Sequence, residues 1–155
     1  MRKAIHYSRH VGISISVPRI EPLELQFSAI GIDIQSIKEI GASLEQFGNR
    51  FTSRLFTRRE IDAWCGSTSE TPRYFAEAFA AKEAVLKILV VRESVPPWKS
   101  IELLRSRGGP SIGLHGSTAE LARQQFINMI QVSISHDGDT VIAVAVSTRA
   151  PNARS

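Results

Sequence analysis

The longest predicted helix of the chain lies near its middle, where apolar and polar residues recur with helical spacing over residues 71–87. One face of this helix is largely apolar and is formed by Phe75, Phe79, Lys82 and Leu86. We expect Thr71 to be the N-cap and Pro72 to occupy the first helical position. Residues that favour helices fill most of the remainder. This helix is therefore the element around which we expect the rest of the chain to pack.

Glu83 and Lys87 lie four residues apart beside the apolar face, so both side chains can point along the same side of the helix. This spacing leaves two interpretations open. The two residues either form a solvated ion pair, worth roughly 0.2–0.5 kcal/mol, or make up half of a site for a metal ion and a phosphate group.

Alternating apolar and polar residues predict strands on both sides of this helix. The runs with this pattern, or next to turn sequences, are residues 11–17, 23–34, 98–104, 111–114, 129–135 and 141–146. Shorter helices are predicted at residues 36–47, 57–64 and 119–126, with residues 50–56 as a connecting segment. No internal repeat interrupts this order.

Capping and turn sequences mark where several of these elements begin and end. Thr57-Arg58-Arg59-Glu60 is a capping box at the start of a short helix. Gly48-Asn49 is expected to end the preceding helix, and Ser117 or Thr118 to cap a later one. His136-Asp137-Gly138-Asp139 predicts a hairpin turn before the last strand.

Asp33 interrupts the apolar run Ile30-Gly31-Ile32-Asp33-Ile34, so in a strand its carboxylate points away from Ile32 and Ile34. A buried carboxylate without a partner is costly, and this position therefore needs an explanation. One explanation is that Asp33 caps the helix that starts near Gln35. The other, which we favour, is that Asp33 is a ligand for a hard cation, because a carboxylate at a rigid strand end suits that role.

The composition indicates a single domain. A chain of 155 residues with 43% apolar residues can bury a full core. Cys65 is the only cysteine, so an intrachain disulfide is impossible and a cysteine-based zinc site is not expected. No run approaches the roughly 18 apolar residues of a membrane span, and no signal-peptide pattern follows the basic N-terminal residues. We therefore expect a soluble protein of the reducing cytoplasm.

The formal net charge of +4 permits an acidic partner, such as nucleic acid, a phosphorylated cofactor or an acidic protein. The densest basic cluster contains Arg50, Arg54, Arg58 and Arg59. Basic and aromatic residues do not alternate as they do in proteins that bind single-stranded nucleic acid. This distribution argues against nucleic acid and leaves the other two classes.

Three sequence motifs occur in a specific order. They are Gly31-Ile32-Asp33-Ile34, then Phe79-Ala80-Ala81-Lys82-Glu83-Ala84 with Lys87, and then Val132-Ser133-Ile134-Ser135-His136. Together they resemble the holo-acyl-carrier-protein synthase family of the 4′-phosphopantetheinyl transferases, over residues 28–147. The stretch from Arg54 to Glu60 also looks like that family's Arg-x-Leu-(Ser/Thr)-x-x-Glu segment.

The resemblance implies an α+β fold in which a small antiparallel sheet packs on a long helix. It also implies a Mg²⁺-dependent transferase that moves the 4′-phosphopantetheine arm of coenzyme A onto a serine of an apo acyl carrier protein and releases 3′,5′-ADP. The carrier would be of the fatty-acid or polyketide type. Short members of the family are homotrimers with coenzyme A between subunits. Residues 1–27 are then an extension, either an extra strand or partly ordered, and residues 148–155 a polar tail.

The resemblance assigns roles by position. Asp33 and Glu83 would bind Mg²⁺, and these two with Lys87 would form the catalytic group. Glu83, or a water on the metal, would relay the serine proton. The positions expected to contact coenzyme A are Arg54, Lys82, Lys87 and His136, the last near the nucleotide end.

Four features depart from the family pattern. Ala78 stands where an arginine is usual, and Ser36 and Glu39 replace a glutamate and an arginine in the first helix. The family's glycine-containing loop after the last motif lysine is absent behind Lys87. In the family, those glycines let the backbone approach the cofactor. The family arginine that Glu39 replaces contacts an acidic carrier, which a glutamate at this position would repel.

These departures leave two explanations. The chain is either an active transferase with an unusual carrier and a rebuilt cofactor loop, or a diverged, non-catalytic homologue that binds a carrier protein or coenzyme A. We favour the enzyme, because keeping Asp33, Glu83 and Lys87 together has no obvious structural need.

Overall fold

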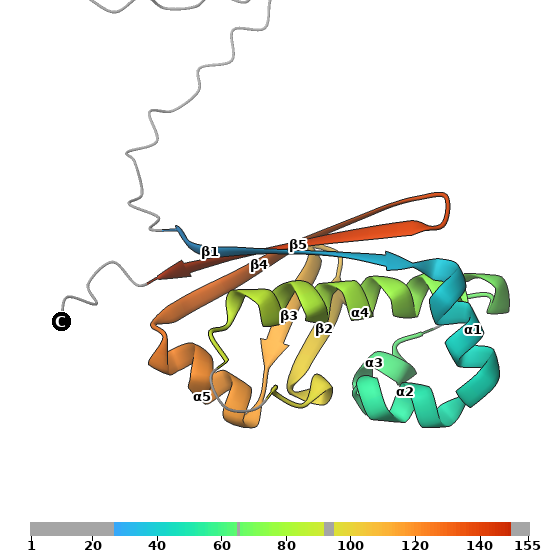
Figure 1. The fold of residues 1–155 in the computed structure, drawn as a ribbon, viewed down its shortest axis with the longest axis horizontal. Helices are drawn as coiled ribbons and strands as arrows, with labels where there is room; N and C mark the ends of the chain where they lie inside the picture. The colour runs from blue at the N-terminus through green and yellow to red at the C-terminus, as the bar shows by residue number, and fades with distance from the viewer. Residues whose placement is uncertain (1–26, 65, 92–94, 150–155) are drawn as a thin grey trace, which may run out of the picture.

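Figure 1 shows the fold in a computed structural model, which describes residues 27–64, 66–91 and 95–149. The elements are β1 (Phe27–Ser36), α1 (Ile37–Phe47), α2 (Asn49–Leu55), α3 (Arg58–Asp62), α4 (Thr71–Ile88), β2 (Ile101–Ser106), β3 (Gly109–Leu114), α5 (Gly116–Gln124), β4 (Ile127–Asp137) and β5 (Thr140–Arg149). Short 3₁₀ turns precede α4 and β2 at Thr68–Glu70 and Trp98–Ser100. The predicted strand at 11–17 and residues 150–155 of the predicted tail lie outside the described residues.

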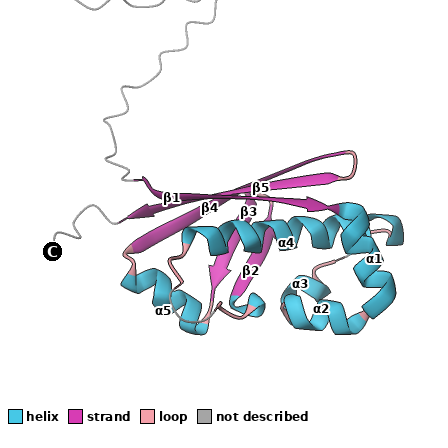
Figure 2. Ribbon diagram, in the orientation of Figure 1, coloured by secondary structure: helices cyan, strands magenta, loops and turns pink. Residues whose placement is uncertain are grey.

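The five strands form one antiparallel sheet in the order β1-β5-β4-β3-β2. Figure 2 shows α4 running along the sheet, with α1 to α3 at one end of the molecule and α5 at the other. The predicted α+β architecture, a small antiparallel sheet packed on a long helix, is confirmed.

Helix α4 is buried on more than one face, because the sheet covers one side and α1 packs against another. Its buried residues are Tyr74, Phe75, Ala76, Ala78, Ala80, Ala81, Lys82, Ala84, Val85 and Ile88. The many alanines let the sheet approach closely. At Gly31 of β1, an added Cβ would lie only 1.9 Å from the carbonyl oxygen of Ala84. Glycine is therefore required there by the helix–sheet contact.

Local signals predicted some element boundaries correctly and others wrongly. The capping box is confirmed, since Thr57 Oγ1 accepts from Glu60 N at 3.1 Å and Glu60 Oε2 accepts from Thr57 N at 2.8 Å. The prediction that residues 50–56 are a connecting segment is wrong, because almost all of them belong to helix α2. Gly48 makes this possible: its φ of +50° turns the chain sharply, so that α2 follows α1 directly.

Two predicted caps are also wrong. Thr71 is inside α4 and donates to the carbonyl of Ser67 instead of capping the helix. His115 occupies the N-cap position of α5, while Thr118 is buried and bonds to Ser100. Among the described helices, none is long and apolar enough to cross a membrane.

Candidate active site

Asp33 lies on the face of β1 that packs on α4, and its carboxylate is buried. Only 8% of Asp33 is exposed, whereas Ile30, Ile32 and Ile34 on the other face are 52–63% exposed. The expected strand alternation is thus confirmed, with the acid inside and the isoleucines outside. The interpretation of Asp33 as a helix cap is wrong, because Ser36 Oγ accepts the capping bond from Glu39 N.

Both oxygens of the Asp33 carboxylate have a partner. Lys87 Nζ donates to Oδ1 at 2.8 Å and to the Ile32 carbonyl at 2.7 Å, and Gln35 Nε2 donates to Oδ2 at 2.8 Å. Lys87 therefore turns toward the strand. In the described part of the chain it forms no ion pair with Glu83, so the interpretation as a simple i,i+4 pair does not hold.

Glu83 carries a carboxyl group whose acidity the site weakens. Burial, and next the neighbouring charge of Asp33, raise the pKa of Glu83, and Lys87 only partly offsets them. Two carboxylates and one ammonium group therefore share one electrostatic environment at the junction of β1 and α4. Such like-charge neighbours are typical of functional sites.

The donor set fits magnesium. No group of three or more His, Cys, Asp or Glu residues that could hold a metal occurs among the described residues. Mg²⁺, however, usually keeps several waters and takes only one or two protein carboxylates together with substrate phosphates. Asp33 and Glu83 supply those two, and they are the residues whose mutual repulsion a cation would relieve.

A cavity of about 440 Å³ lies beside these residues. It is lined by Glu83, Leu86, Lys87, Leu89, Val91, Val95 and Trp98. One end is charged and the remaining wall is aliphatic and aromatic, so the cavity suits a ligand with an anionic part joined to an uncharged chain. The apolar wall comes from the segment after α4, which the motifs did not reveal.

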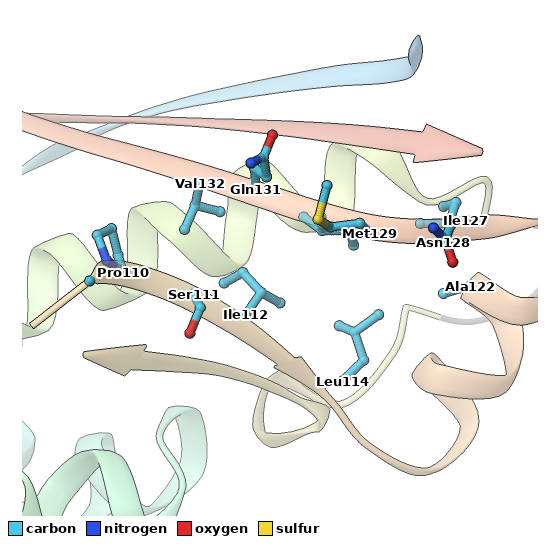
Figure 3. Close-up of a pocket in the computed structure, with 12 residues that line it drawn as sticks. Pro110, Ser111, Ile112, Leu114, Ala122, Ile127, Asn128, Met129, Gln131 and Val132 are labelled. Atoms are coloured by element: carbon cyan, nitrogen blue, oxygen red, sulfur yellow. The ribbon is translucent and has the colours of Figure 1, made fainter. Parts of the chain in front are cut away.

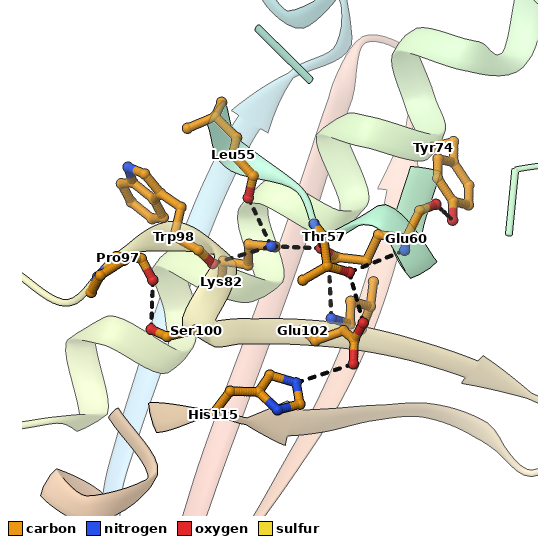
Figure 4. A network of polar contacts seen from close by, with 11 residues as sticks. Leu55, Thr57, Glu60, Tyr74, Lys82, Pro97, Trp98, Ser100, Glu102 and His115 are labelled. Carbon is orange, nitrogen blue, oxygen red and sulfur yellow. Dashed lines mark hydrogen bonds and ion pairs between the residues drawn. The ribbon is translucent and has the colours of Figure 1, made fainter. Parts of the chain in front are cut away.

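Lys82 lies inside the protein and is not one of the residues that line this cavity. Its side chain is fully buried, and Nζ donates to Glu60 Oε2 at 2.7 Å and to the carbonyls of Leu55 at 2.9 Å and Trp98 at 3.2 Å (Figure 4). Burial lowers the pKa of Lys82, and Glu60 opposes that effect. All three ammonium hydrogens are used, so the expectation that Lys82 contacts coenzyme A does not fit this geometry.

The other two predicted contacts lie elsewhere on the surface. His136 belongs to β4 rather than to the turn, and its Nδ1 lies 3.4 Å from Glu77 Oε1 of α4. Glu77 also pairs with Arg105 of β2 at 2.8 Å. Arg54 is exposed on α2. The structure thus brings Asp33, Glu83 and Lys87 together, and neither His136 nor Arg54 has a contact with that group.

Sequence reasoning missed Gln35 as a partner of Asp33. The signal was present, because residues two apart in a strand share a face, and Gln35 follows Asp33 at that spacing. The capping interpretation of Asp33 places Gln35 at the start of a helix, whereas β1 continues to Ser36.

The chain is similar to known proteins in both sequence and fold. The sequence model of the 4′-phosphopantetheinyl transferase superfamily matches residues 29–146. A holo-[acyl-carrier-protein] synthase of Alkaliphilus metalliredigens is 42% identical over 120 residues, which cover 77% of this chain and 97% of the relative.

Two solved structures also match. The holo-[acyl-carrier-protein] synthase of Neisseria meningitidis has a TM-score of 0.69 at 29% identity, covering 79% of this chain and 98% of that one. The Helicobacter pylori enzyme, solved in complex with coenzyme A, has a TM-score of 0.65 at 31% identity, covering 77% and 99%.

Proposed function

The chain belongs to the 4′-phosphopantetheinyl transferase superfamily, and we propose that it moves the 4′-phosphopantetheine arm of coenzyme A onto a serine of an apo acyl carrier protein. The observation that carries this proposal is the convergence of Asp33, Glu83 and Lys87 beside one cavity. Transfer of a phosphoryl group depends mainly on positioning and on neutralising charge. A pair of carboxylates for a cation and an ammonium group for phosphates provide both.

The reaction joins the serine oxygen of the carrier to the phosphorus that bears the pantetheine arm. The bond from this phosphorus to the bridging pyrophosphate oxygen breaks, and 3′,5′-ADP leaves. Glu83 accepts the serine proton, directly or through water. Burial, and next the neighbouring charge of Asp33, raise the pKa of Glu83 above the usual value for a glutamate, which is the direction that favours accepting a proton. Lys87 places a positive charge beside the phosphates.

We assign Asp33 and Glu83 as the protein ligands of Mg²⁺. The ion would neutralise charge on the pyrophosphate when bound. The support is that Glu83 lines the cavity, while the Asp33 carboxylate lies close enough to raise the pKa of Glu83. Gln35 and Lys87, the second of which also lines the cavity, orient the Asp33 carboxylate. Lys87 is 49% exposed, so it can turn from Asp33 toward a phosphate without crossing the core.

The partner is an acidic carrier protein of fatty-acid or polyketide synthesis, and the enzyme acts in the cytoplasm. Arg50, Arg54 and Arg59 are exposed on α2 and α3 and form no ion pair within the described part of the chain. Glu39 on α1 is exposed as well and would repel an acidic helix. The carrier therefore docks closer to α2 and α3 than to the first turn of α1.

The active form is a homotrimer. The sheet face opposite α4 carries large apolar side chains that are 40–63% exposed, namely Ile30, Ile32, Ile34, Met129 and Ile142. A row of this kind is unusual on a monomer and typical of an association surface. The charge substitution Ile32→Asp should give a monomer by light scattering after size exclusion, while Glu45→Lys, an equally exposed change on α1, should not.

The test of the reaction is the intact mass of an apo acyl carrier protein after incubation with this chain, coenzyme A and Mg²⁺. A gain of one phosphopantetheine group, lost with Glu83→Gln and with Asp33→Asn but kept with Glu45→Gln, is the expected result. No gain with any of several fatty-acid and polyketide carriers would indicate a non-catalytic homologue. Binding of coenzyme A that persists in Glu83→Gln would then identify its remaining role.

A further inference from the structure

Strands β3 and β4 are neighbours in the sheet but separate along most of their length. Their ladder holds a single residue pair, Ser111 with Gln131. By contrast, β4 pairs with β5 from Ile127 to Asp137. Figure 3 shows the two strands diverging, with side chains of both facing the gap. Within the described residues, the rest of the β4 edge toward β3 therefore has no strand partner.

The divergence opens a groove of about 700 Å³ between β3, β4 and α5. Its aliphatic lining is formed by Ile112, Leu114, Ile127, Ile130 and Val132. These side chains pack against the core, yet each stays partly exposed. A groove with an aliphatic wall along an open strand edge suits an extended segment that pairs through its backbone and inserts alternate side chains.

We propose that residues 11–17 of the same chain occupy this groove as an added strand. Their apolar positions are Val11, Ile13, Ile15 and Val17, and they alternate with one glycine and two serines. The strand would cover the aliphatic lining with one face and turn the small polar residues outward. Pro18 follows directly and would end the pairing there, because proline has no N–H to donate.

The first described residue, Phe27, lies at the end of the sheet that is near the groove. Phe27 pairs with Thr148 of β5, which pairs with Met129 of β4 beside the groove. Adjacent strands are about 4.8 Å apart, so two to three strand spacings of roughly 10–15 Å separate Phe27 from the groove. Residues 18–26 can span up to roughly 30 Å when extended. The connection is therefore long enough without distorting β1.

The experiment is amide hydrogen exchange on the full chain, without coenzyme A or carrier, followed by mass spectrometry of peptides from β3 and β4. The double substitution Ile13→Asp/Ile15→Asp should raise exchange at residues 111–114 and 127–131 by about tenfold or more, because the amides lose a strand partner. The matched control Ser14→Asp/Ser16→Asp adds the same charges on the opposite face. It should leave exchange in both strands unchanged.

Equal exchange in wild type and both double variants would overturn the proposal. So would a change confined to β1 or to the outer sheet face around Ile32, since the segment would then pack there instead. Protection of β3 and β4 that rises with protein concentration even in the Ile32→Asp background, where the proposed trimer is absent, would show that the segment of a second copy fills the groove and would overturn the arrangement within one chain. Circular dichroism of each variant checks that the described domain remains folded.

Discussion

Lys87 Nζ on α4 lies 2.8 Å from Asp33 Oδ1 on β1, although the two residues are 54 positions apart in the sequence. The ion pair joins the helix that carries Glu83 to the strand that carries Asp33. Half of the Lys87 side chain is exposed and Gln35 also donates to the buried Asp33 carboxylate, so the pair is not the sole partner of that carboxylate. The main effect of the pair is to hold the charged groups of Asp33, Glu83 and Lys87 close to one another.

Lys87→Met should therefore impair transfer in a chain that still folds. We expect kcat/KM for coenzyme A to fall by about 10²-fold or more, because a charge that stabilises the phosphates is removed. The free energy of unfolding should fall by about 1–3 kcal/mol, because the buried Asp33 carboxylate keeps only the bond from Gln35. Carrier mass against time gives the rate, and urea titration gives the stability. Lys87→Arg should recover part of the activity, and Lys38→Met, an exposed lysine on α1, should lose none.

Coenzyme A and Mg²⁺ together should raise the thermal stability of the chain. A ligand at about 100 times its Kd stabilises the folded state by about 2.7 kcal/mol, which corresponds to roughly 5–10 °C in Tm for a domain of this size. EDTA should remove the magnesium-dependent part of the shift. Glu83→Gln should abolish that part while keeping some response to coenzyme A alone. A full shift in EDTA would contradict the assignment of Asp33 and Glu83 to the metal.

The sequence predicted the core of the site because each signal was local. Strand periodicity placed Asp33 opposite Ile32 and Ile34, and helical periodicity placed Glu83 and Lys87 on one side of α4. Both placements need only the geometry of a single element. That Lys87 turns to Asp33 rather than to Glu83 depends on how β1 docks on α4, which no local pattern contains.

Lys82 shows the limit of motif reasoning. It lies in the middle of the motif, directly before Glu83, and on the apolar face with Phe75 and Phe79. Its partner Glu60 is 22 positions away, in a capping box that accounts for that glutamate without any lysine. Only the packing of α3 against α4 reveals that the two form a buried pair.

The Lys82–Glu60 pair should be a major determinant of stability. Both side chains are almost completely buried, and Glu60 also accepts from the backbone N–H groups of Thr57 and Leu103. Lys82→Met would leave a buried carboxylate without its counter-charge, at a cost of about 3–5 kcal/mol. Urea unfolding measures this cost.

A double-mutant cycle distinguishes the pair from general packing. Each single change leaves one buried charge without its partner, whereas the double variant Glu60→Gln/Lys82→Met leaves none. The double variant should therefore cost at least about 1 kcal/mol less than the sum of the two single changes. Additive costs would show that the lysine acts through its methylene groups. Lys38→Met should change stability by no more than about 0.5 kcal/mol.

Glu102 should make stability depend on pH in the acidic range. Its side chain is 6% exposed, accepts from Thr57 Oγ1 at 2.7 Å and lies 3.2 Å from His115 Nε2 (Figure 4). Burial by itself would raise the pKa of Glu102, but the bonds from Thr57 and His115 and the charge of Arg59 outweigh it and lower the pKa below 4.5.

A folded-state pKa below the unfolded value means that this stabilisation is present above about pH 4.5 and is lost as the pH falls through the folded pKa. Wild type should therefore exceed Glu102→Gln in free energy of unfolding by roughly 1–2 kcal/mol at mildly acidic pH, with the difference shrinking below about pH 4.5. Urea titrations over this range test it. A difference in free energy of unfolding that grows as the pH falls would contradict a lowered pKa for Glu102. The control Glu45→Gln, at an exposed position on α1, should show no dependence of this kind.

The close contact between β1 and α4 leaves no space for a side chain at position 31. An added Cβ at Gly31 would lie 1.9 Å from the Ala84 carbonyl oxygen and 3.2 Å from Lys87 Cβ. Both neighbours belong to the turn of α4 that carries the site. Gly41 in α1 offers a contrast, because a Cβ there would meet only Pro72, at 3.4 Å.

Gly31→Ala should therefore reduce activity by more than its effect on stability explains. Because the Cβ meets backbone, α4 must move away from β1, and overpacking of this kind costs about 1–3 kcal/mol. The same movement separates Asp33 from Lys87 and Glu83, so we expect the initial rate to fall by about 10²-fold even where the variant is fully folded. Gly41→Ala should keep full activity and gain up to about 1 kcal/mol, since alanine is the better helix former. If the two variants behave alike in rate assays and urea unfolding, the close approach of β1 to α4 does not position the site.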